Sequence, residues 1–272
     1  MAADLDLGQP ASLIRVDRLL RRWAERSTTE PTLRLRPGQG PAHGAALWGL
    51  TAHVYAQAAR IRPLIDHGEG IELAPVVRAM LECSLRAQWL AQRGPKALPS
   101  FLHDGARQRL NLGTSMMQAA WVGMSAEIIE RLQEDVPSKG ELDEQARRFE
   151  RMLNDFDSGT VLYTFFRFLS GLSHPSTSLI DAYTDTDERT RAVSLRHRAA
   201  LDGAEATWTW LIVLALVWAW SALDSVSSES PDRHYLRSVA RETGTAAMLE
   251  LSAEAKRQKF LDEYEAGRRP RT

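Results

Sequence analysis

The strongest constraint on the fold is the segment WTWLIVLALVWAWSAL, residues 208–223, which is apolar on every side. A helix without a polar stripe has to be covered all round, by other protein segments or by lipid. The segment is shorter than the roughly 20 residues that cross a bilayer, and Glu205 and Asp224 lie at its ends. We therefore expect it to be the central helix of a soluble bundle, with membrane association as the less favoured alternative.

The rest of the chain also has helical periodicity. Apolar residues recur at helical spacing almost everywhere, and no stretch shows a clean alternation of period two. The expected helices cover residues 11–26, 42–67, 71–93, 97–123, 125–135, 138–156, 160–173 and 189–224, with one or two more within 232–272. Helices joined by short connections predict an all-α fold, an antiparallel multi-helix bundle.

Two polar connections divide this bundle. The Pro/Gly-rich stretch TEPTLRLRPGQGP follows the first helix, and SVSSESPD follows the apolar segment. We expect an N-terminal helix with its connection in residues 1–41, a core helical bundle in residues 42–225 and a polar C-terminal helical extension in residues 226–272.

Charge and cysteine content limit the classes of function. The formal net charge is −1, so RNA contact, if any, has to be local rather than a property of the whole surface. A single cysteine, Cys83, excludes an internal disulfide and a cysteine-based zinc cluster. The histidines are scattered and no phosphate-binding or hydrolase motif is present, so we expect no metal and no cofactor. The acidic N-terminus lacks an apolar signal core, which favours the cytoplasm.

The first polar pattern within an apolar helix is Arg78-x-x-x-Glu82. Residues four apart share a helix face, and here that face is surrounded by apolar side chains. Charges in such a setting are costly to bury unless they are paired. The pattern predicts that Arg78 and Glu82 are largely buried and paired, with each other or with polar groups near His174. Such a pair would be either a structural salt bridge or a polar wall of a binding pocket.

The second pattern is Arg167-Phe-Leu-Ser-Gly-Leu-Ser-His174. Seven residues are nearly two helical turns, so Arg167, Ser170 and His174 share one stripe, and Ser173 lies beside it. Arg binds phosphate oxygens in a bidentate way, and His transfers protons near neutral pH. The pair therefore predicts a site that helps a ribose 2′-OH attack its own phosphate without a metal. In the competing interpretation, His174 caps the C-terminus of the helix, and Ser170 and Gly171 are packing residues.

Two resemblances follow from these residues. The helix–break–helix of residues 47–92, with its V-V-R-A-M-L-E core, and the later element Ser170-x-x-x-His174 resemble the bacterial helical proteins grouped as domain of unknown function 5677. That resemblance extends over roughly residues 42–225.

The spacing from Arg167 to His174 is similar to the Arg-x(4–6)-His signature of the HEPN superfamily. Those proteins are compact, often dimeric helical bundles, and many are metal-independent ribonucleases of toxin, CRISPR and phage-defence systems. The resemblance implies that Arg167 contacts the scissile phosphate and that His174 is the acid/base. Phe168 departs from the pattern, because active members commonly have a polar residue directly after the Arg.

We therefore expect a HEPN-like, metal-independent endoribonuclease of bacterial defence or stress response, with catalytic residues Arg167 and His174 and binding residues Ser170, Ser173, Arg78 and Glu82. The expected partners are RNA, a second copy of the chain and a protein encoded in the same defence or toxin–antitoxin operon, without a membrane. The alternative is a non-catalytic helical binding or structural protein with a buried Arg–Glu–His polar network.

Overall fold

The computed structural model describes residues 9–29, 32–68, 70–199 and 204–268, and nearly all of its regular structure is helical. The helices are α1 (Gln9–Thr29), α2 (Pro41–Asp66), α3 (Ala74–Arg93), α4 (Ala97–Gln118), α5 (Ala126–Glu134), α6 (Asp143–Arg147), α7 (Phe149–Leu153), α8 (Gly159–Ser173), α9 (Thr177–Tyr183), α10 (Ala204–Val226), α11 (Arg233–Glu242) and α12 (Ala253–Arg268). Short 3₁₀ turns cover Ile71–Leu73 and Gly94–Lys96, and strands β1 (Thr184–Asp187) and β2 (Ala192–Leu195) form a hairpin. The predicted all-α multi-helix bundle is confirmed.

The chain forms two compact units. The first contains Met1–Gln88 and Thr160–Leu249, and the second contains Trp89–Gly159 and Glu250–Thr272. The first unit holds α1, α2, most of α3 and the helices from α8 to α11, and the second holds α4 to α7 and α12. The three segments expected from the sequence remain a prediction about domain organisation.

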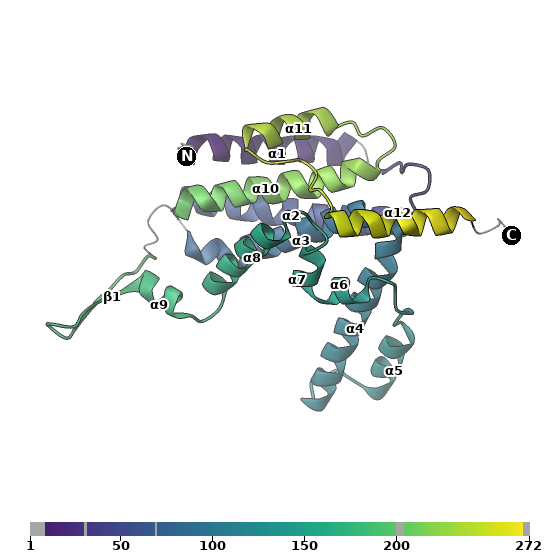
Figure 1. The fold of residues 1–272 in the computed structure, drawn as a ribbon. Helices are drawn as coiled ribbons and strands as arrows, with labels where there is room; N and C mark the ends of the chain where they lie inside the picture. Colours follow the sequence, from purple (N-terminus) through teal and green to yellow (C-terminus); the bar gives the residue numbers. More distant parts are fainter. Residues whose placement is uncertain (1–8, 30–31, 69, 200–203, 269–272) are drawn as a thin grey trace. The chain divides into compact units, whose positions relative to one another are not determined.

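Helix α10 is the core of the first unit. It lies against α1, α2 and α11 (Figure 1). Its stretch Thr207–Val226 is long and apolar enough to cross a membrane, but 89% of the most apolar window is buried inside the protein. This burial is that of the central helix of a soluble protein, as the sequence predicts.

Aromatic rings hold α1 and α2 on α10. The rings of Trp23 and Tyr55 stack with centroids 4.5 Å apart, and the edge of Trp220 meets them at 5.4 and 5.6 Å. Next to these rings, the hydroxyl of Thr51 donates a hydrogen bond of 3.0 Å to the backbone oxygen of Ala219. Aromatic pairs in these geometries stabilise a core beyond the area they bury.

The second unit has its own polar anchor. The side chain of Arg93 is buried, donates to the backbone oxygen of Ala255 at 2.9 Å and lies 3.5 Å from the carboxylate of Asp155. The indole of Trp89 donates to the same carboxylate at 2.8 Å. Burial raises the pKa of Asp155, while these two donors act in the opposite direction. These contacts tie the end of α3 to α12 and to the segment after α7.

The predicted helix over residues 189–224 is wrong in its first part. Residues 184–195 form the β1–β2 hairpin, and the described part of α10 begins at Ala204. The carboxylate of Asp187 accepts hydrogen bonds from the backbone N–H groups of Arg189 and Thr190, and Arg191 has a φ of +54°. Asp and Thr favour such turns because their side chains compete for backbone hydrogen bonds.

Two other predicted helices are shorter than expected. The charged segment 138–156 contains α6 and α7, which are separated by Arg148 in an extended conformation. Helix α4 ends at Gln118, and Ala120 and Gly123 adopt positive φ in the turn before α5. Local backbone geometry of this kind is not visible in hydrophobic periodicity.

The packing of α1 provides a direct test of this core. Leu19 is fully buried, whereas Ile14 on the same helix is exposed. We expect Leu19→Ala to lower the free energy of unfolding by about 2–5 kcal/mol, because it removes buried methyl groups and leaves a cavity. Ile14→Ala is the matched control and should change it by no more than about 0.5 kcal/mol. Equal effects of the two substitutions in urea-unfolding experiments would contradict this packing of α1.

Candidate functional site

The candidate site lies on the exposed face of α8, in the first unit. Five exposed residues form one stripe at alternating spacings of four and three: Thr160, Thr164, Arg167, Gly171 and His174. This alternation keeps side chains on one side of a helix and is the spacing used when two helices pack along their length. Val161 and Phe168 flank the stripe and are themselves exposed, although they are apolar.

Arg167 and His174 are both available to a ligand. Each is exposed, and neither side chain makes a hydrogen bond or ion pair with any other described residue. His174 directly follows the last residue of α8, and Pro175 comes after it. The structure therefore places both predicted catalytic side chains on the same solvent-facing stripe.

The two serines of the motif have structural hydrogen bonds. The hydroxyl of Ser170 donates to the backbone oxygen of Phe166 at 2.8 Å, and that of Ser173 donates to Leu169 at 2.7 Å. A hydroxyl has one proton to donate, so neither serine is a ready donor for a ligand. Ser170 can accept, and in the structure it accepts from an arginine.

That arginine is Arg78 of α3. Its Nε donates to the Ser170 hydroxyl at 2.9 Å, and its guanidinium carbon lies 4.5 Å from the centre of the Phe166 ring. A guanidinium over an aromatic face is attracted by the negative charge of the ring's π system. Arg78 therefore anchors α8 on α3 and supports the helix that presents Arg167 and His174.

Glu82 does not pair with Arg78. Its carboxylate lies 3.1 Å from Arg86, one turn further along α3, and Arg78 and Glu82 are partly exposed rather than buried. Of the two kinds of partner expected for Arg78, Glu82 is not used among the described residues, whereas Ser170, a polar group near His174, is. The expected burial of Arg78 and Glu82 is wrong. Both side chains have other partners. The guanidinium of Arg78 contacts Ser170 and the ring of Phe166, and the carboxylate of Glu82 accepts from Arg86.

Sequence reasoning missed the role of the aromatic residues of α8. The ring of Phe168 is 46% exposed and stacks on Trp208 with centroids 6.0 Å apart. Trp208 itself is buried at the start of α10. Phe168 therefore packs α8 against α10. The density of aromatic residues in TVLYTFFRFL was the available signal.

Within the described residues, the exposed face of α8 has neither a reactive thiol nor a metal-binding cluster beside it. Burial raises the pKa of the Cys83 thiol to about 11, so the thiol stays protonated at neutral pH. No group of three or more His, Cys, Asp or Glu residues within the described parts of the chain could hold a metal ion. The chemistry that α8 offers is that of a cation and an imidazole.

The anchoring role of Arg78 can be measured with a double-mutant cycle. We expect Arg78→Ala and Ser170→Ala to be coupled by about 0.5–1.5 kcal/mol in unfolding free energy, because they share one hydrogen bond. Glu82→Ala serves as the comparison and should cost only about 0.5 kcal/mol, because the partly exposed pair with Arg86 is screened by solvent. Additive effects of Arg78→Ala and Ser170→Ala would exclude the anchor.

Comparison with known proteins assigns the chain to a family. A family model described as a family of unknown function, DUF5677, matches residues 44–191, which contain Arg78, Glu82, Arg167 and His174. Neither a curated protein nor a solved structure matches the chain. The match covers more than half of the sequence and confirms the first of the two resemblances drawn from it. The chain therefore belongs to the DUF5677 family, whose function is not known.

Proposed function

We propose that this protein is a metal-independent endoribonuclease of the HEPN type, acting in the cytoplasm in bacterial defence or stress response. The observation that supports this proposal is that Arg167 and His174 both lie on the exposed face of α8, two turns apart and without partners among the described residues. Many other arginines of the chain are held in ion pairs, such as Arg62 with Asp17 and Arg86 with Glu82.

The chemistry needs a phosphate clamp and two proton carriers. Arg167 binds the non-bridging oxygens of the scissile phosphate. One neutral imidazole takes the proton of the ribose 2′-OH, whose oxygen then attacks the phosphorus. The bond from phosphorus to the 5′ oxygen breaks, and a protonated imidazole donates its proton to that leaving oxygen. The products are a 2′,3′-cyclic phosphate and a 5′-hydroxyl end.

One chain supplies a single His174, so we propose that the site is completed by a second copy. Val161 and Phe168, both exposed, and Gly171, where an added Cβ would meet nothing, make this face of α8 suitable for helix pairing. If two α8 helices pack antiparallel with a two-fold axis beside Gly171, Arg167 of each chain lies opposite His174 of the other. Both imidazoles then border one groove.

The second candidate is a non-catalytic helical binding protein. It is favoured by the hydrogen bonds of Ser170 and Ser173, which are satisfied within the chain, and by the packing of Phe168 on Trp208. In this case α8 would serve as a docking helix for a protein partner, such as the product of a neighbouring gene in a defence or toxin–antitoxin operon. The two candidates differ in whether pure protein cleaves RNA.

We expect the purified protein to cleave single-stranded RNA in the presence of EDTA and to leave 2′,3′-cyclic phosphate ends. His174→Ala should lower the cleavage rate by about 10²–10⁴-fold, because it removes the proton carrier. Arg167→Ala should also lower it strongly. The matched controls are His53→Ala and Arg60→Ala, since both residues are exposed on α2 away from this motif.

The thermal transition of each variant should remain that of the native protein, since these four side chains are exposed. If diverse RNAs stay intact, or if His53→Ala and His174→Ala cleave equally well, the ribonuclease proposal is wrong. Cleavage that EDTA abolishes would exclude the metal-independent mechanism.

Pairing through α8 is tested by cross-linking. In a Cys83→Ser background, Gly171→Cys should form a disulfide-linked dimer under mild oxidation, because a two-fold axis beside this position brings the two Cβ atoms within disulfide reach. Ala56→Cys, exposed on α2, is the control and should stay monomeric on a denaturing gel. Equal cross-linking of both variants would reflect random collision, and monomeric Gly171→Cys would exclude this dimer.

A further inference from the structure

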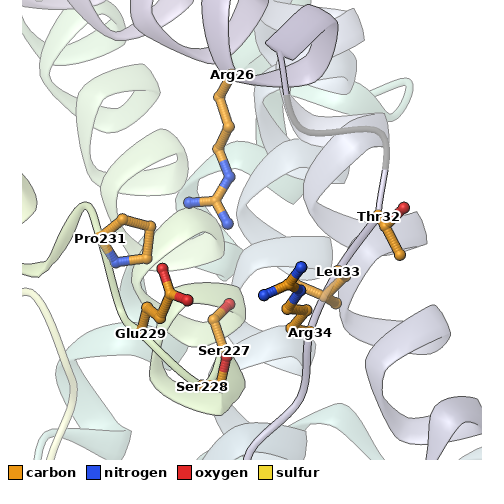
Figure 2. Close-up of a pocket in the computed structure, with 8 residues that line it drawn as sticks. All are labelled: Arg26, Thr32, Leu33, Arg34, Ser227, Ser228, Glu229 and Pro231. Carbon is orange, nitrogen blue, oxygen red and sulfur yellow. The ribbon is translucent and has the colours of Figure 1, made fainter.

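A separate cavity lies at the far end of α10, away from the α8 motif in the sequence. It has a volume of about 340 Å³ and is formed by the end of α1, the connection that follows it and the linker after α10 (Figure 2). Its lining combines two arginines, two serines, a glutamate and a leucine: Arg26, Arg34, Ser227, Ser228, Glu229 and Leu33. Nothing in the proposed ribonuclease chemistry uses these residues.

A second, more apolar cavity adjoins the first. It has a volume of about 540 Å³, and Arg26, Thr32 and Leu33 line both cavities. Its remaining lining is mostly apolar and includes Leu35, Pro41, Ala45 and Trp48. Trp48 packs on Trp23, with ring centroids 5.1 Å apart. Volumes of this size hold small organic molecules.

The wall of the polar cavity is held by backbone pairing between the two connections. The N–H of Arg36 donates to the backbone oxygen of Val226 at 2.9 Å, and the N–H of Ser228 donates to that of Arg34 at 2.9 Å. The Arg36 side chain adds a bond of 2.9 Å from its Nε to the backbone oxygen of Ser227. Residues 34–36 and 226–228 thus pair backbone to backbone beside the cavity.

The side chain of Arg26 has a fixed position in the wall of this cavity. Its side chain is only 9% exposed, and its guanidinium forms an ion pair with Asp232 and lies 3.9 Å from Asp224. These carboxylates fix the orientation of the guanidinium, which points into the space between the two connections (Figure 2). A fixed guanidinium loses little conformational entropy when it binds an anion.

Arg34 and Glu229 supply free charges on opposite sides of the same cavity (Figure 2). Both are exposed, and neither side chain makes a hydrogen bond or an ion pair with another described residue. Arg34 can bind an anionic group, and Glu229 can accept hydrogen bonds from hydroxyl or amino groups. The exposed Ser228 can add its hydroxyl.

We propose that these adjoining cavities bind a ribonucleotide. Its phosphate would be held by Arg34 and Arg26, its hydroxyl groups by Glu229 and Ser228, and its base by the apolar side chains around Trp48. A free phosphate would leave the apolar cavity empty, and an apolar molecule would leave Arg34 unpaired. A ligand that combines a flat ring, hydroxyls and a phosphate uses both parts.

The proposal is tested by isothermal titration calorimetry with the full chain and the probes AMP, GMP, CMP and UMP. At least one nucleotide should bind saturably, and the corresponding nucleoside and inorganic phosphate should each bind at least tenfold more weakly. Arg34→Ala and Trp48→Leu should each weaken binding of that nucleotide about tenfold or more. Arg21→Ala, an exposed arginine on α1, is the control and should leave binding unchanged.

The two sites can be separated experimentally. The double variant Arg167→Ala, His174→Ala should keep full nucleotide affinity, because the proposed site shares no residue with the α8 motif. Absence of saturable binding by all four nucleotides would overturn the proposal. Equal affinity for inorganic phosphate and for the nucleotide, or unchanged affinity in Arg34→Ala, would overturn it as well.

Discussion

Burial of α10 is the constraint on which the first unit depends. A helix without a polar side needs neighbours on every face, and α1, α2 and α11 are among those that supply them. The neighbouring helices also have to satisfy polar atoms beside this apolar surface. Gln88 of α3 does so by donating to the backbone oxygen of Trp218 at 2.8 Å. Hydrogen bonds from Thr51 of α2 and Gln88 of α3 to the backbone of α10 therefore help to set the positions of these two helices against its apolar surface.

The position of α8 is also set by contacts with its neighbouring helices. Its inner side carries the buried Leu162, Leu169 and Leu172. Its flanks are held by two aromatic contacts, Phe168 on Trp208 and Phe166 beneath Arg78, and by the Arg78–Ser170 hydrogen bond. With that side fixed, Arg167, Gly171 and His174 have to face solvent, because they lie on the opposite side of the helix. The outward display of the candidate catalytic pair is thus a consequence of packing on the inner side.

Features that depend on residues close in the sequence could be predicted, whereas contacts between distant segments could not. The buried state of α10 follows from the lack of any polar side on that segment. The common side of Arg167 and His174 on α8 follows from helical periodicity, which depends on neighbours three and four residues away. The sequence left two kinds of partner open for Arg78, Glu82 and the polar groups near His174. It could not choose Ser170, because Ser170 is distant in sequence and Glu82 is the nearer candidate. The β1–β2 hairpin was missed because its strands are exposed and carry no alternation of apolar and polar residues. The cavity around Arg26 and Arg34 depends on backbone pairing between segments on either side of the core, which no local pattern indicates.

The partners of the arginine side chains separate those that hold the fold together from those that are open to a ligand. Arg26 belongs to both groups, because it is ion-paired and also lines a cavity. Arg62 and Arg93 each contact a carboxylate of another segment and tie elements together, whereas Arg86 pairs with Glu82 on its own helix. Arg34 and Arg167 are exposed and have no such partner among the described residues. A chain with a formal net charge of −1 does not attract anions through its overall field. In the two proposals, recognition of phosphate therefore relies on individual guanidinium groups, each beside a second functional group. That group is His174 on α8 and the apolar cavity of Trp48 at the end of α1.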